Sequence, residues 1–163
     1  MHRFPAGLIM GLIAASGSLQ AAETRIETVA DGLEHPWSLA FLPDGRQLVT
    51  ERAGRLRVID DDGNLQESPV SGLPDDIHVR GQAGLKDVVL DPDFEDNQRI
   101  LLTYSCGTAR ANHLCIASAT FNGTELADLE EIFRAQPSKT GSAHYGGRLA
   151  FLPDGTFVAT VGD

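Results

Sequence analysis

Leu39-Ala-Phe-Leu-Pro-Asp-Gly45 and Leu149-Ala-Phe-Leu-Pro-Asp-Gly155 are the same seven residues, and Leu85-Lys-Asp-Val-Val-Leu-Asp-Pro-Asp-Phe94 is a variant of the same pattern. Each stretch is an apolar segment that runs into a Pro-Asp turn. The aspartates of these turns are Asp44, Asp93 and Asp154. The unit therefore recurs roughly every 50–60 residues, a spacing typical of repeat folds such as propellers and solenoids.

Each repeat opens a group of short strands separated by Gly or Asp turns. The first group is predicted at Trp37–Leu42, Gln47–Glu51, Arg55–Asp60 and Leu65–Val70. The second is predicted at Leu85–Leu90, Arg99–Ser105, Leu114–Phe121 and within Leu126–Ala135. The third has Arg148–Leu152 and Thr156–Val161. Four consecutive strands with tight turns form an antiparallel meander.

These groups predict an all-β chain, a β-propeller of four-stranded antiparallel blades truncated to about two and a half. A closed ring needs about four to eight blades. A β-sandwich explains the strands equally well, but not the recurrence of one motif at the head of each group. Residues 126–135 also fit a short helix by periodicity, but their place after the Asn122-Gly123 turn favours a strand.

The N-terminus resembles an export signal over residues 1–22. A basic start at Arg3 is followed by the apolar run Gly7–Ala15 and by the small residues Ser16–Ala22. The run is too short to span a bilayer, so we expect a periplasmic or secreted protein without membrane insertion once the signal is removed. The alternative is a buried first strand or helix. Residues 23–163 would then form the N-terminal part of an incomplete propeller.

The formal net charge of −10 argues against binding nucleic acid or an anionic membrane surface. It also offers no help in holding an anionic cofactor. The two cysteines, Cys106 and Cys115, flank a short loop between two predicted strands. In an oxidising compartment this pair predicts a disulfide across a hairpin. A metal site is the alternative, although two cysteines without a nearby second pair of ligands are a poor zinc pattern.

Alignment of the repeats on their Pro-Asp turns gives Asp87 and Arg148 equivalent positions on the innermost strands of adjacent blades. A lone buried ion is costly. We therefore predict an Asp87–Arg148 ion pair that bridges blades two and three near the channel. The alternative is that each side chain reaches water or a backbone carbonyl by itself.

Three polar residues lie in the loops that enter the first strands: His35, Gln82 and His144. Radial repetition brings such loops to one rim, where binding and catalysis usually concentrate. Gln82 and His144 are flanked by glycines, which let the backbone approach a ligand closely. An imidazole there suits proton transfer near neutral pH. Each also has an ordinary explanation as a surface, turn or loop-bracing residue.

Several motifs in this order resemble one known family, the glucose/sorbosone dehydrogenases. The matching segments are His35-Pro-Trp-Ser-Leu-Ala-Phe-Leu-Pro-Asp-Gly45, Val49-Thr-Glu-Arg52, Gly54-Arg-Leu56, Gly81-Gln-Ala-Gly-Leu85, Asp91-Pro-Asp-Phe94, His144-Tyr-Gly-Gly-Arg-Leu149 and Val161-Gly-Asp163. The family comprises soluble aldose sugar dehydrogenases that depend on pyrroloquinoline quinone (PQQ). The resemblance implies a six-bladed propeller that oxidises the anomeric C–OH of sugars in the periplasm.

The resemblance further implies that His144 is the general base and that Gln82 contacts the sugar. The residues that grip PQQ, and the calcium ligands, lie beyond Asp163 in the family. PQQ, calcium, the sugar and an electron acceptor are thus expected for the full-length protein, and residues 1–163 alone are expected to be inactive. Glucose-oxidising members have an acid immediately before the histidine where this chain has Ala143, so glucose selectivity does not carry over. A calcium-dependent lactonase and a non-catalytic sugar- or protein-binding propeller are the alternatives.

Overall fold

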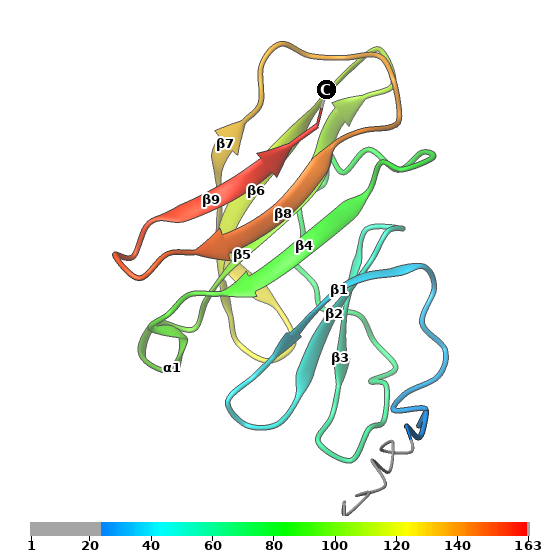
Figure 1. Ribbon diagram of the computed structural model, residues 1–163, viewed down its shortest axis with the longest axis vertical. Coiled ribbons are helices and arrows are strands. Elements are labelled where there is room, and N and C mark those ends of the chain that lie inside the picture. The colour runs from blue at the N-terminus through cyan, green and yellow to red at the C-terminus, as the bar shows by residue number, and fades with distance from the viewer. Residues whose placement is uncertain (1–23, 163) are drawn as a thin grey trace, which may run out of the picture.

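The computed structural model describes residues 24–162, so the predicted signal peptide lies outside the described residues. Three antiparallel sheets follow one another along the chain (Figure 1). The first contains β1 (Pro36–Phe41), β2 (Gln47–Glu51) and β3 (Arg55–Ile59). The second contains β4 (Leu85–Leu90), β5 (Arg99–Thr108), β6 (Ala111–Phe121) and β7 (Leu126–Arg134). The third contains β8 (Gly146–Phe151) and β9 (Phe157–Val161), and a short helix, α1 (Phe94–Asn97), joins β4 to β5.

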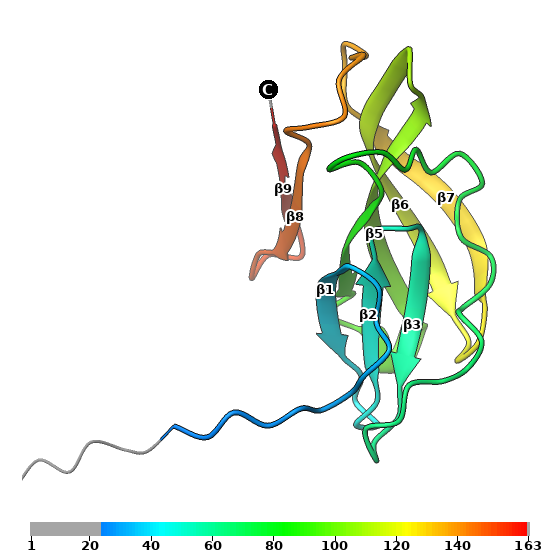
Figure 2. The ribbon, with the colours of Figure 1, turned by 90° about the vertical axis from the view of Figure 1, so that its right-hand side faces the viewer.

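The repeated segments form the first strand of each sheet, and these strands lie side by side. Strand β4 contacts β1 on one side and β8 on the other, as Figure 1 shows. In Figure 2 the β8–β9 sheet stands beside the second sheet and is not continuous with it. This radial arrangement of successive meanders is that of propeller blades and differs from the two face-to-face sheets of a sandwich.

The predicted fourth strand of the first blade, Leu65–Val70, was wrong as a continuous strand. Only its two ends pair with β3, through the isolated bridges Ile59↔Leu65 and Leu56↔Val70. Pro69 lies between these bridges, and its lack of an N–H interrupts a hydrogen-bonded ladder. The first sheet of the described residues therefore has three strands.

In the second blade, strands β5 and β6 are longer than predicted. Their pairing continues through Gly107↔Asn112 to Thr108↔Ala111, so the predicted loop between the cysteines is mostly strand. The segment after the Asn122-Gly123 turn is strand β7, as its position in the meander indicated. Helix α1, which the sequence did not predict, has four residues. Within residues 24–162 no helix has the length and apolarity needed to cross a membrane.

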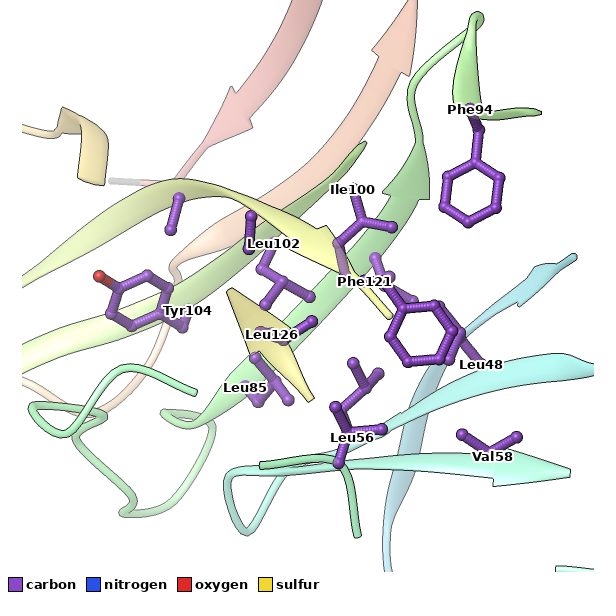
Figure 3. Close-up of a cluster of buried hydrophobic side chains, with 14 of the residues drawn as sticks. Leu48, Leu56, Val58, Leu85, Phe94, Ile100, Leu102, Tyr104, Phe121 and Leu126 are labelled. Carbon is purple, nitrogen blue, oxygen red and sulfur yellow. The ribbon is translucent and has the colours of Figure 1, made fainter. Parts of the chain in front are cut away.

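One apolar core joins the first sheet to the second. Its fully buried members include Leu48, Leu56, Val58, Leu85, Ile100, Leu102 and Phe121, shown in Figure 3. Burying one such side chain stabilises the fold by about 1.5–3 kcal/mol. A smaller cluster built on Leu101, Ile116 and Leu149 joins the second sheet to the third. These two cores fix the positions of the three inner strands, and hence of the loops that enter them.

Candidate functional site

An acidic side chain on β4 connects all three sheets. Asp87 Oδ1 lies 2.9 Å from Arg148 Nη1 on β8. Asp87 also accepts hydrogen bonds from the Ser38 hydroxyl on β1 and from the Leu149 backbone N–H, 2.7 Å away on β8. One carboxylate thus bonds to the inner strands of the first and third sheets. Alignment of the repeats predicted the arginine contact but neither of the other two.

The two partners of this ion pair differ in burial. The Asp87 side chain is 1% exposed, whereas that of Arg148 is 58% exposed. The expectation that both charges are packed between blades is therefore wrong for Arg148. Its guanidinium lies 4.4 Å from the centre of the Trp37 ring, so an exposed cation covers an aromatic face while it pairs with the carboxylate.

His144 lies in the loop that leads into β8, and its side chain is exposed. Its φ of +57° is in the left-handed region, which is costly for a residue other than glycine. Contacts on both sides stabilise it. Its backbone N–H donates to Gln82 Oε1 at 2.9 Å, and its carbonyl accepts from Lys139 Nζ at 2.9 Å. These two hydrogen bonds hold the backbone of His144 in its strained conformation, and so they fix the point from which the imidazole extends.

The structure brings Gln82 and His144 together, because the two loops are bonded twice. Besides the Gln82 side-chain contact, the Gln82 backbone N–H donates to the Ser142 carbonyl at 2.9 Å. Gln82 therefore acts as a loop brace, one of the roles that the sequence left open. His35 also has a left-handed φ of +50°, and its carbonyl accepts from the Arg52 N–H. Its link to the Gln82 turn is indirect, through the bond from Arg52 Nη1 to the Gly81 carbonyl.

The end of the β5–β6 hairpin supports the His144 loop from the other side. Asn112 and Lys139 exchange backbone hydrogen bonds of 2.9 Å each. The buried Tyr145 hydroxyl donates to Asn112 Oδ1 at 2.6 Å. Beside His144 lies a cleft of about 230 Å³, whose walls include Asn112, Leu114, Lys139, Tyr145 and Val161. Sequence reasoning missed Asn112 and Tyr145, which are ordinary strand and loop residues by type.

Cys106 and Cys115 are joined by a disulfide across this hairpin, with Cα atoms 5.8 Å apart. Both cysteines are fully buried. Within residues 24–162, the one cluster of three candidate metal ligands is these two cysteines with Glu131. Disulfide sulfurs are not thiolates and so do not ligate a metal. The hairpin therefore has a structural bond where the sequence left a metal site as the alternative.

The acidity of the chain does not extend to this rim. Burial on β4 lowers the pKa of Lys86, and the nearby charges of Lys139 and Arg52 lower it further. Positive side chains thus gather beneath Gln82 and His144. The net charge alone therefore does not describe this part of the molecule, where three basic side chains lie close together. Lys86, a lysine among the mostly apolar residues of the predicted inner strand, was the signal that could have revealed it.

Comparison with known proteins agrees with this architecture. Residues 33–163 match the family model described as "Glucose / Sorbosone dehydrogenase". The aldose sugar dehydrogenase YliI of Escherichia coli (strain K12) is 37% identical over 173 residues, which covers 100% of this chain and 45% of the relative. The chain spans between 36% and 45% of the length of the curated relatives it matches.

Two solved structures extend the likeness to three dimensions. A structure titled as glucose dehydrogenase has a TM-score of 0.78 at 37% identity and covers 83% of this chain and 40% of that one. The PQQ-bound aldose sugar dehydrogenase of Streptomyces coelicolor has a TM-score of 0.69 at 29% identity and covers 84% and 40%. The all-β propeller prediction is confirmed by these neighbours. Sequence, fold and blade junctions agree: the chain belongs to the glucose/sorbosone dehydrogenase family.

Proposed function

We propose that the full-length protein, of which residues 23–163 are the N-terminal part, is a PQQ-dependent dehydrogenase that oxidises an aldose at its anomeric C–OH. The observation that carries this is the Gln82–His144 pair, joined at 2.9 Å on the loops that enter β4 and β8, in a chain of this family. The E. coli relative is named an aldose sugar dehydrogenase, and the S. coelicolor structure is described as PQQ-bound. A periplasmic or secreted location and an electron acceptor outside this chain belong to the same proposal.

The residues beside His144 fit an anionic cofactor. PQQ carries carboxylates, and the side chains of Lys86, Lys139 and Arg52 bring three basic groups close together here despite the acidity of the whole chain. The resemblance assigns the residues that grip PQQ to the sequence beyond Asp163. Among the described residues, the one cluster of three candidate His, Cys or acidic ligands is the disulfide with Glu131, which offers calcium a single carboxylate. Calcium is therefore proposed for the full-length protein alone.

In the proposed reaction, the His144 imidazole removes the proton of the anomeric hydroxyl. When bound, PQQ would supply a two-electron acceptor for the hydride of the same carbon, so that the sugar would become a lactone. The left-handed backbone, held by Gln82 and Lys139, fixes the imidazole at the mouth of the cleft. Gln82 orients the sugar through its amide while its Oε1 braces the loop. Residues 1–163 alone should be inactive, because the gripping residues would be missing.

The test is His144→Ala in the full-length protein, assayed by aldose-dependent dye reduction after loading with PQQ and calcium. We expect turnover to fall roughly 10²–10⁴-fold, with PQQ binding retained in an absorbance titration. His78→Ala, in the loop before β4, is the matched control and should retain activity. Turnover of His144→Ala within a few-fold of the wild type would refute the assignment. A wild-type protein that binds sugar but never reduces the dye would instead favour the non-catalytic propeller.

A further inference from the structure

Lys86 is an unusual residue for the innermost strand of a blade. It lies in β4 and is 3% exposed, among neighbours that are almost all buried. The third sheet makes room for its side chain. A Cβ on Gly147 of β8 would come within 2.7 Å of Lys86 Cδ, and Gly147 has a φ of +95° that also favours glycine. The lysine stem is thus built into the junction between the second and third blades.

The ammonium group of Lys86 contacts both candidate loops. Nζ donates a hydrogen bond to the Gln82 carbonyl at 2.8 Å. It also lies 4.8 Å from the centre of the Tyr145 ring and 5.7 Å from that of Trp37, within the range of cation–π attraction. Tyr145 directly follows His144, and Gln82 accepts the His144 N–H. One buried cation therefore lies beneath the two residues assigned to the reaction.

Lys86 is retained at a cost to stability. Burial, followed by the charges of Lys139 and Arg52, lowers its pKa from 10.5 to about 8. Between pH 8 and 10.5 the unfolded chain then binds more protons than the folded chain, so this group makes stability rise with pH over that window. At pH 7 the folded protein carries a buried ammonium that opposes folding. Residues that break the local packing rule in this way concentrate at functional sites.

The other charged or titratable groups around Lys86 do not neutralise it. Lys139 donates to the Ala143 and His144 carbonyls, and Arg52 donates to the Gly81 carbonyl. Asp87, the next residue in β4, is engaged by Ser38, Arg148 and Leu149. Tyr145 is buried, and burial raises the pKa of its hydroxyl.

We propose that Lys86 is a positioning residue whose ammonium holds the Gln82 turn against the Tyr145 loop and so sets the placement of the His144 imidazole relative to Gln82. The inference rests on the proposed dehydrogenase function. It adds a residue that touches neither sugar nor cofactor and acts through a backbone carbonyl and an aromatic face. Above about pH 8 the ammonium loses its proton, both contacts weaken, and the site should lose efficiency.

The experiment compares the full-length wild type with Lys86→Met, which keeps the stem but removes the charge, and Lys86→Arg, which keeps the charge. The wild type should show an alkaline decline in kcat/KM near pH 8. Lys86→Met should be roughly 10–100-fold less efficient at pH 7 and should lack that decline. Lys86→Arg should restore part of the efficiency and move the decline upward, because guanidinium stays protonated. A wild-type-like pH profile in Lys86→Met would overturn the proposal.

A second readout does not depend on activity. In full-length protein with ¹⁵N-labelled histidines, the His144 ring signals, assigned by their absence in His144→Ala, should differ between Lys86→Met and the wild type at the same pH. Melting temperature should rise over pH 8–10 in the wild type but not in Lys86→Met. Unchanged His144 signals would refute the positioning role. If these signals shift but the wild type never oxidises a sugar, the dehydrogenase proposal fails and the structural role of Lys86 stands.

Discussion

Removal of the Asp87 carboxylate should unfold the blade junction at much lower denaturant concentration. Asp87→Ala deprives the buried Leu149 N–H and the Ser38 hydroxyl of their acceptor, and each unsatisfied buried donor costs about 1–3 kcal/mol. The Arg148 ion pair adds at most about 1 kcal/mol, because that side chain is 58% exposed and water screens it. The free energy of unfolding should therefore fall by about 2–7 kcal/mol.

The assay is urea unfolding of the full-length protein, with Asp44→Ala as the matched control. Asp44 pairs with Arg46 at 2.7 Å, but the two side chains are 52% and 30% exposed. Its loss should cost less than about 1 kcal/mol. Both variants thus remove an aspartate that lies at a similar distance from its arginine partner. The two aspartates differ in their burial and in the number of hydrogen bonds that they accept across blades. Equal losses for Asp87→Ala and Asp44→Ala would refute the reasoning that the cross-blade bonds, more than the ion pair, hold the junction.

Two further predictions concern the buried Glu51 carboxylate and the Cys106–Cys115 disulfide. Burial alone would raise the pKa of Glu51, but the hydrogen bond and charge of Arg55 outweigh it, so this pKa lies below 4.5 and the stability it contributes is lost as the pH falls through it. Glu51→Gln should therefore lower the urea midpoint of unfolding at pH 7. It should also make this midpoint less dependent on pH below 4.5. A variant whose urea midpoint falls with acid as steeply as that of the wild type would contradict this. Replacing both Cys106 and Cys115 by Ser should lower the free energy of unfolding by about 2–3 kcal/mol. Mass spectrometry of the exported protein should find no free thiol at either position. Two free thiols would contradict the prediction.

The repeats at Leu39–Gly45, Leu85–Phe94 and Leu149–Gly155 were sufficient to predict the fold. An apolar strand that ends in a Pro-Asp turn is encoded locally, so its recurrence reports the number and order of blades without any knowledge of tertiary contacts. Alignment of the repeats also placed Asp87 opposite Arg148, because equivalent positions of adjacent blades face one another. The pattern has a limit at Leu65–Val70, where the predicted continuous strand does not form because one proline interrupts the pairing with β3.

The chemistry of the rim was decided by tertiary structure. The left-handed φ of His144, the bond from its N–H to Gln82 and the support from Lys139 join segments that the sequence separates, and residue type does not encode them. Lys86 shows the same limit. In the sequence it is one charge in a strand, and only its burial between two blades, beside two other cations, lowers its pKa to about 8. A local pattern determines which strands form, whereas burial and contacts between distant segments determine what each side chain can do, because desolvation depends on the whole surrounding fold.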